Sequence, residues 1–149
     1  MTRAEQELFS TAAITSFKLN GQFLAVGEEL ARPAGITVAW WQVLGAVARE
    51  PLPVAGIARE MGITRQSVQR IADLVVDKGL AEYRPNPAHH RAKLVAITES
   101  GRAAVRRIGP QHARMADRLI SELGIDALTE IVAGLTKLSA ALDAMAEKP

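Results

Sequence analysis

The chain has 149 residues, enough to bury one core of ordinary size but few for two independent domains. Hydrophobic residues make up 48% of it and aromatic residues only 4%, so it is rich in Ala, Leu, Val and Ile, which favours helices over strands. The absence of cysteine excludes a disulfide framework, a thiolate metal cluster and a thiol redox switch. No segment predicts a secretion signal or a membrane span, so we expect a cytoplasmic protein without membrane contact.

The charges are unevenly distributed, although the formal net charge is only +2. Residues 52–98 contain seven Lys or Arg against four Asp or Glu, together with His89 and His90. Residues 101–121 contain five arginines and one acidic residue, whereas the segment from Glu122 onward is net acidic. The middle of the chain is therefore the electropositive part.

Two helices are predicted in the first third of the chain. Residues 4–31 carry apolar side chains at helical spacing, and Pro33 and Gly35 close the run. A second helix should begin at Thr37, whose hydroxyl can cap it, and contain Trp40 and Trp41. Pro51 and Pro53 should then form a loop.

The next segment predicts two short helices joined by a tight turn. The first runs from Val54 to Gly62, and the second starts at Thr64, a natural N-cap, and ends near Gly79. Apolar positions at helical spacing let both helices share one core. These positions are Ile57, Ala58, Met61, Ile63, Val68, Ile71 and Val75.

Beyond Gly79 the pattern changes to alternation. Residues 80–84 and 92–98 read as strands flanking the loop PNPAHHR, which predicts a β-hairpin. Residues 99–101 should join it to an Arg-rich helix up to about Leu123, and a last helix should run from Asp126 to about Ala146. The first and last helices have more apolar surface than so small a module can cover.

The helix that begins at Thr64 has the features of a DNA-recognition helix. It presents long polar side chains near its N-terminus, where arginine can pair with guanine, glutamine with adenine, and hydroxyls and backbone amides with phosphate. The predicted DNA contacts on this helix are Thr64, Arg65, Gln66, Ser67, Gln69 and Arg70. The hairpin would add a second contact through Arg84, His90, Arg91 and Lys93.

Residues 52–103, together with the segment from Thr37 to Leu44, resemble the winged helix-turn-helix core of the MarR family, and Trp41 matches the family tryptophan. The resemblance implies a mainly α fold with a two-stranded β-wing and dimerisation helices at both ends. Residues 1–36 and 102–149 would form an intertwined dimer around the DNA-binding lobe at 37–101.

As members of this family do, the homodimer would bind a palindromic operator on double-stranded DNA and repress transcription until a small, anionic aromatic effector releases it. Family pockets lie near the second helix, the wing root and the fifth helix. Trp41, Arg84 and His112 are therefore the candidate ligand-binding residues, although aromatic residues at helical spacing more often belong to the core.

The wing departs from the family pattern at one place. The family usually has an Asp followed by two arginines where this chain has His89, His90 and Arg91, so only Arg91 matches. The Asp normally braces a wing arginine, and histidine is positively charged only when protonated. This exchange suggests a less rigid wing and DNA binding that depends on pH.

Other functions are less well supported by the sequence. No nucleophile with a base, paired carboxylates or phosphate-binding glycine loop is present, so we expect no enzyme and no cofactor. His89, His90 and the distant His112 do not make a metal site. The alternative is a winged-helix protein-interaction module without specific DNA binding, but such a module should expose apolar anchors on its outer helix rather than Arg, Gln and Ser.

Overall fold

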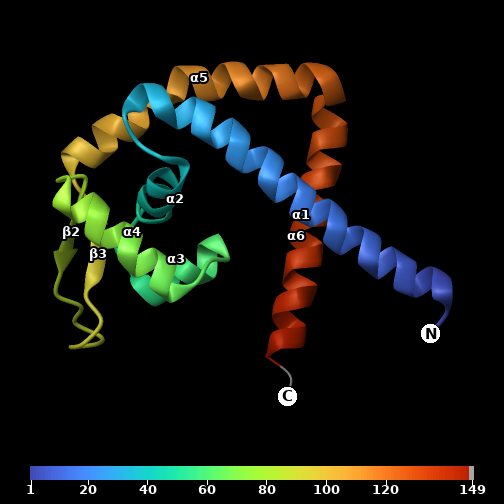
Figure 1. Cartoon of the computed structure of the whole chain (residues 1–149), viewed down its shortest axis with the longest axis horizontal. Coiled ribbons are helices and arrows are strands. Elements are labelled where there is room, and N and C mark those ends of the chain that lie inside the picture. The colour runs from blue at the N-terminus through green and yellow to red at the C-terminus, as the bar shows by residue number, and fades with distance from the viewer. Residues whose placement is uncertain (148–149) are drawn as a thin grey trace. The chain divides into compact units, whose positions relative to one another are not determined.

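The computed structural model describes residues 1–147, which form two compact units divided after Gly109. The first unit contains α1 (Arg3–Ala31), a short 3-10 turn (Arg32–Ala34), α2 (Val38–Ala46), α3 (Val54–Met61), α4 (Arg65–Asp77), three strands and the first turns of α5 (Glu99–Leu123) (Figure 1). The second unit contains the rest of α5 and α6 (Ile125–Ala146). None of the helices in residues 1–147 combines the length and apolar character needed to cross a membrane.

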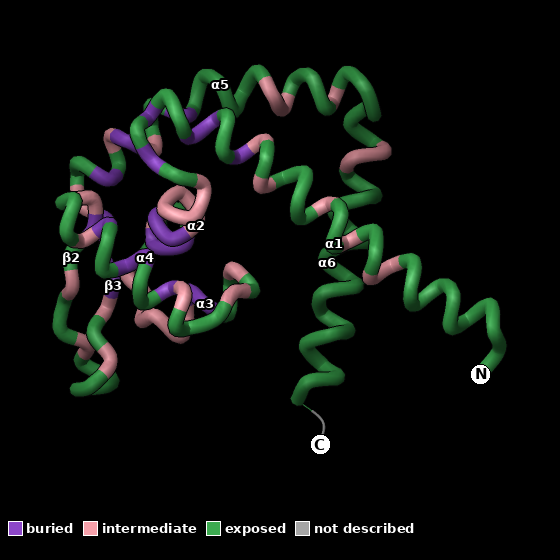
Figure 2. Tube along the Cα trace, in the orientation of Figure 1, coloured by how far each residue is buried: buried purple, intermediate pink, exposed green. Residues whose placement is uncertain are grey.

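The core of the first unit lies where α2, α3 and α4 meet the sheet, as Figure 2 shows. Its fully buried side chains come from every one of these elements and from α5. The largest of them are Val43, Leu44, Val47, Ile57, Val68, Val75, Val95 and Ile108. Complete burial of one such side chain contributes about 1.5–3 kcal/mol, so the lobe has its own source of stability.

Local capping signals place the helix ends as the sequence predicts. The Thr37 hydroxyl accepts a hydrogen bond from the Trp40 amide at 3.1 Å, and the Thr64 hydroxyl accepts one from the Ser67 amide at 3.1 Å. Gly62 ends α3 in the left-handed conformation with φ of 66°, which glycine adopts without strain. The helix-turn-helix prediction is confirmed.

The hairpin is confirmed, but its sheet has a third strand. Strand β2 (Ala81–Arg84) pairs antiparallel with β3 (Leu94–Ile97), and β1 (Leu52–Pro53) pairs with the other edge of β3. The prediction of a loop through Pro53 is therefore wrong for Leu52 and Pro53. A two-residue edge strand tolerates proline because its outer side needs no ladder donor.

Helix α5 begins earlier than predicted, since residues 99–101 form its first turn rather than a junction. The Thr98 hydroxyl donates to the Gly79 carbonyl at 2.6 Å and accepts from the Gly101 amide at 3.1 Å. A Cβ atom at Gly101 would lie 2.0 Å from the Leu80 carbonyl oxygen. The absence of a side chain at Gly101 thus allows α5 to start against the Leu80 backbone, between α4 and β2.

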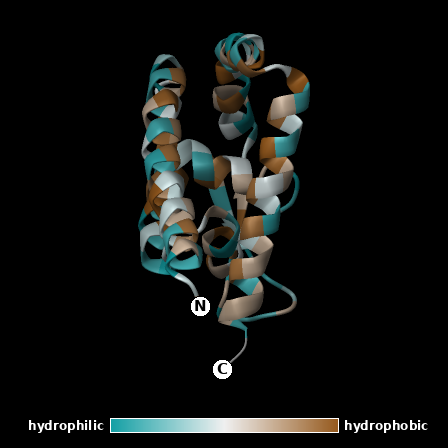
Figure 3. Cartoon of the chain, turned by 90° about the vertical axis from the view of Figure 1, so that its right-hand side faces the viewer, coloured by the Kyte–Doolittle hydropathy of each residue, from teal (hydrophilic) through white to brown (hydrophobic). Residues whose placement is uncertain are grey.

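The terminal helices keep much of their apolar surface exposed. Figure 3 shows apolar residues recurring along the helices that end at the N and C labels. On α1 the large apolar residues that are exposed are Leu8, Phe9, Ile14, Phe17 and Phe23. On α6, which has no buried residue, they are Ile125, Ile131, Val132, Leu135, Leu138, Leu142 and Met145.

Candidate nucleic-acid interface

Helix α4 turns one face to the core and the opposite face to solvent. Its inward positions Val68, Ile71, Ala72 and Val75 are buried. Its outward positions include most of the predicted DNA contacts, namely Arg65, Gln66, Gln69 and Arg70. Burial of the inward face fixes the rotation of α4 about its axis. The long polar side chains on the opposite face therefore point to solvent.

The two hydroxyl residues at the start of α4 have structural partners already. Thr64 caps the helix, and its hydroxyl also donates to the Ser67 hydroxyl at 2.9 Å. Ser67 is half-buried, whereas Arg65 and Gln66 are exposed. Thr64 therefore serves first as the N-cap that fixes the start of α4, and the N-terminus of a helix is a site that suits phosphate.

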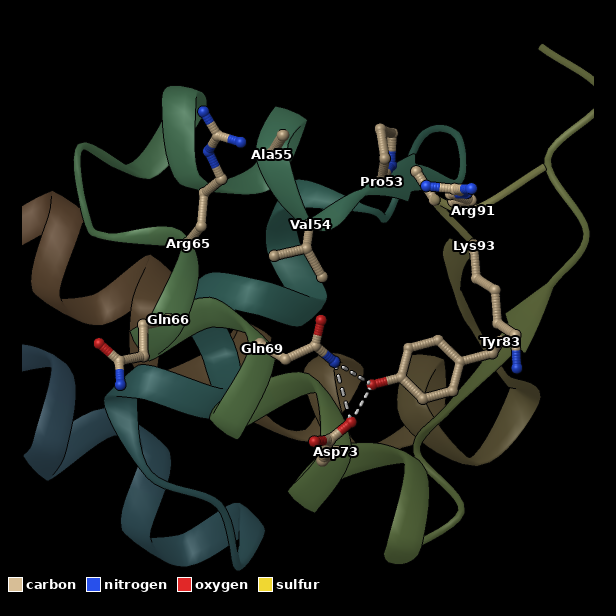
Figure 4. A pocket seen from close by; sticks show the side chains of 11 residues that line it. Pro53, Val54, Ala55, Arg65, Gln66, Gln69, Asp73, Tyr83, Arg91 and Lys93 are labelled. Atoms are coloured by element: carbon tan, nitrogen blue, oxygen red, sulfur yellow. Dashed lines mark hydrogen bonds between the residues drawn. The ribbon is translucent and has the colours of Figure 1, made fainter. Parts of the chain in front are cut away.

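A hollow of about 580 Å³ lies between α4 and the wing. Its walls come from α4, from the strand and helix start at residues 53–55, and from the wing residues Tyr83, Arg91, Ala92 and Lys93. Figure 4 shows Arg65 on one side of this hollow and Arg91 and Lys93 on the other. Three cations around one concave surface attract an anionic partner.

A hydrogen-bonded cluster joins α4 to the wing at the base of this hollow. The Gln69 side-chain nitrogen donates to Asp73 Oδ1 and to the Tyr83 hydroxyl, each at 3.0 Å, and the Tyr83 hydroxyl donates to Asp73 Oδ1 (Figure 4). Partial burial, followed by the bond to the Asp73 carboxylate, raises the pKa of Tyr83 to about 12. Lys93 lies over the Tyr83 ring, with its Nζ 5.9 Å from the ring centre.

The wing itself is held by short-range contacts. Arg84 pairs with Glu82, with Nη2 to Oε1 at 2.8 Å, and both side chains stay about half exposed. At the tip, the Asn86 side-chain oxygen accepts from the Ala88 amide at 3.0 Å and the Asn86 carbonyl from the His89 amide at 3.1 Å. His89, His90 and Arg91 are exposed. The predicted pH dependence of the wing remains a prediction.

Comparison with known proteins identifies the family to which this combination of helix α4 and wing belongs. A sequence profile of the MarR family matches residues 34–92, from the end of the 3-10 turn to the wing. A protein of Mycobacterium tuberculosis and one of Mycobacterium bovis, both uncharacterised, are each 38% identical to this chain over 133 residues, which cover 89% of this chain and 92% of the relative. The chain belongs to the MarR family of winged-helix transcription regulators.

Solved structures share the fold of this MarR family protein at low sequence identity. BldR from Sulfolobus solfataricus has a TM-score of 0.78 at 18% identity, covering 95% of this chain and 99% of BldR. MOSR from M. tuberculosis, solved in complex with DNA, has a TM-score of 0.70 at 20% identity, covering 88% and 97%. BpsR from Bordetella bronchiseptica, whose DNA binding is regulated by 6-hydroxynicotinic acid, has a TM-score of 0.74 at 20% identity, covering 87% and 98%. The predicted mainly α winged helix-turn-helix fold is confirmed.

The three ligand candidates of this MarR family protein come from separate elements. Trp41 is half-buried on α2, and Arg84 ends β2 in its pair with Glu82. His112 is exposed on the part of α5 that belongs to the second unit. A second hollow, of about 320 Å³, is lined by Arg84, His90 and other wing residues. The assignment of Trp41, Arg84 and His112 to one pocket remains a prediction.

Two residues of the α4–wing cluster were absent from the sequence prediction. Asp73 follows Gln69 by one helical turn, a spacing that puts both on one face and could have indicated their hydrogen bond. Tyr83 carries no such signal, because its position opposite Gln69 depends on how strand β2 packs against α4. The sequence placed Gln69 among the base-reading residues without showing that its amide nitrogen has internal partners.

Proposed function

We propose that this protein is a sequence-specific DNA-binding repressor that acts in the cytoplasm as a homodimer on a palindromic operator. The observation that carries the proposal is the hollow between α4 and the wing, where Arg65, Arg91 and Lys93 face one concave surface. Helix α4 would enter the major groove, with Arg65, Gln66, Gln69 and Arg70 toward base edges. The capped helix start at Thr64 and Ser67 would face phosphate.

The wing would contact the neighbouring minor groove or its phosphates through Arg84, His90, Arg91 and Lys93. Arg84 must share its charge with Glu82, so we expect it to contribute less than Arg91. These contacts supply affinity more than base preference, because phosphate carries no sequence information.

The homodimer is supported by the apolar residues that α1 and α6 leave exposed in the single chain. A second copy that interlocks residues 1–36 and 102–149 with their counterparts would cover both sets at once. The two lobes at residues 37–101 would then present two copies of α4 to one palindrome.

Release by a small-molecule effector completes the proposal. BpsR, which shares the fold, has its DNA binding regulated by 6-hydroxynicotinic acid, an aromatic carboxylic acid. Anionic aromatic compounds are therefore the class to test first here, with Trp41, Arg84 and His112 as the candidate contacts.

A catalytic role is not proposed. Catalytic acids and bases commonly have a pKa shifted by burial, and none of the charged or polar side chains among the described residues is buried.

The experiment measures binding of the purified protein to duplex fragments from around its own gene and to unrelated duplex of equal length. We expect tight binding to one palindromic stretch, falling steeply as salt is added because counterions are released. Arg65→Ala and Arg70→Ala should each weaken it roughly tenfold. Lys137→Ala on α6 removes the same charge and should leave affinity unchanged.

Two results would overturn the proposal. Equally weak binding to every fragment would leave the protein-interaction module as the better function. Specific binding that survives both arginine substitutions would move the contact surface away from α4.

A further inference from the structure

The hollow between α4 and the wing is lined by a carboxylate and by cations that do not pair with it. Among the described residues of this lining, Asp73 is the only acidic one, whereas Arg65, Arg91 and Lys93 are basic. Opposite charges attract each other even at an exposed site. Within residues 1–147, however, Asp73 makes no ion pair, and neither do Arg91 and Lys93. The two wing cations are therefore available to an anionic partner.

Tyr83 lies between Asp73 and the wing cation Lys93. Its hydroxyl donates a hydrogen bond to Asp73 Oδ1, and its ring faces Lys93, whose Nζ lies 5.9 Å from the ring centre. Figure 4 shows the Tyr83 side chain extending from the wing to Asp73, with Lys93 on the wing side of the ring. Gln69 donates to the same carboxylate oxygen at 3.0 Å. Asp73 thus receives its hydrogen bonds from two neutral donors instead of from a cation.

We propose that the Tyr83 hydroxyl keeps Arg91 and Lys93 available for DNA by holding the Asp73 carboxylate in a hydrogen bond with a neutral donor. This rests on the proposed function and deepens it, since it names a residue on which the wing contacts depend. Tyr83 is a positioning residue, because its hydroxyl acts on DNA binding through Asp73. The pKa of Tyr83, raised to about 12, keeps this donor protonated at neutral pH.

Loss of the hydroxyl would change the partners open to Asp73. The Asp73 carboxylate is exposed, and Arg91 and Lys93 have long, flexible side chains that line the same hollow. Without the tyrosine donor, one of these cations can turn to the carboxylate, and it must then leave Asp73 before it contacts a phosphate. An exposed ion pair of this kind competes with DNA by roughly threefold to fivefold. Added salt screens the pair, so the competition is strongest at low salt.

The test measures operator affinity at low salt for four full-length proteins: the wild type, Tyr83→Phe, Asp73→Asn and the double variant. Tyr83→Phe keeps the ring and should weaken binding roughly threefold to fivefold. Asp73→Asn removes the competing charge and should bind at least as tightly as the wild type. In the double variant no carboxylate remains to pair with Arg91 or Lys93, so the effect of Tyr83→Phe should disappear.

The control is Asp77→Asn, which removes the same charge from an exposed position of α4 outside the lining of the hollow. Combined with Tyr83→Phe, it should leave the loss of affinity in place. Circular dichroism and gel filtration confirm that each variant is folded.

Two results would overturn the inference while specific binding by the wild-type protein upheld the proposed function. One is unchanged operator affinity in Tyr83→Phe. The other is a double variant of Tyr83 and Asp73 that binds as weakly as Tyr83→Phe, because the hydroxyl would then act by holding the wing in place and not by occupying the carboxylate. Absence of specific binding by the wild-type protein would instead overturn the proposed function, and this inference with it.

Discussion

The DNA-binding lobe and the last helix of this chain use apolar residues in opposite ways. In the lobe, α2, α3, α4 and the sheet bury theirs in a shared core that includes Leu44, Ile57 and Val68 with no exposed surface. Helix α6 is as regular as any helix of the lobe, yet none of its residues is buried in the single chain. Leu135 and Leu138 remain 41% and 37% exposed.

The difference separates two sources of stability. The lobe closes its core with its own residues, so its geometry is a property of one chain. Helix α6 presents an apolar stripe that one chain does not cover, and exposed stripes of this length mark interaction sites. Changes in the lobe should therefore act on unfolding, whereas changes on α6 should act on assembly.

The largest expected effect is on assembly. Leu135→Glu would place one unpaired carboxylate from each protomer in the proposed dimer, at a total cost of about 3 kcal/mol or more, so association should weaken at least roughly a hundredfold. Operator affinity should fall with it, since a monomer presents one recognition helix. Sedimentation equilibrium measures the association, and Lys137→Gln on the same helix is the control. A dimer that persists in Leu135→Glu would contradict the role given to α6.

The second prediction concerns the lobe alone. Gly101→Ala would place a methyl group against the Leu80 carbonyl, where the ideal Cβ lies 2.0 Å from the oxygen. Because backbone on both sides must shift, we expect a loss of about 3 kcal/mol in the free energy of unfolding, measured by urea titration. In Gly45→Ala on α2, the added Cβ has no atom within 4 Å beyond its chain neighbours and its own helix backbone. It should instead stabilise the helix slightly, and equal effects at the two glycines would refute the clash.

The two regions also differ in what the sequence could predict. The helix ends at Thr37, Gly62 and Thr64 follow from local capping chemistry, so they were predicted correctly. Strand β1 was missed because its pairing with Val95 and Leu94 joins distant parts of the chain, which two residues beside a proline do not reveal. The partners of Gln69 were missed for the same reason, since Tyr83 reaches it only after the sheet has packed on α4. The DNA contacts themselves remain predictions, because they depend on the sequence and shape of the DNA as well as on the chain.

A smaller effect distinguishes a helix cap from an ordinary hydroxyl. Thr64→Ala removes the acceptor of the Ser67 amide and should lower the free energy of unfolding by about 1 kcal/mol. Thr129 on α6 also makes a hydrogen bond, from its hydroxyl to the Ile125 carbonyl, but that carbonyl lies within a helix. Thr129→Ala should cost nothing measurable in the same urea titration, because alanine has the higher helix propensity. If both substitutions cost the same, the cap at Thr64 does not stabilise the lobe.

The smallest expected effect is a titration of the lobe at alkaline pH. Tyr83 is the only tyrosine of the chain, so tyrosinate absorbance reports on it alone. Its pKa is raised from 10.0 to about 12 by partial burial and by the Asp73 carboxylate, so the folded state holds the proton more tightly than the unfolded state. The resulting stabilisation is present below pH 10 and is lost as pH rises toward 12, where the Tyr83 hydroxyl of the folded protein also deprotonates.

Tyr83 of the folded chain should therefore titrate near pH 12 and Tyr83 of the urea-unfolded chain near pH 10. The stability advantage of the wild-type protein over Tyr83→Phe should shrink across the same range, and a folded midpoint near 10 would mean that the Tyr83 hydroxyl is not held by Asp73 in solution.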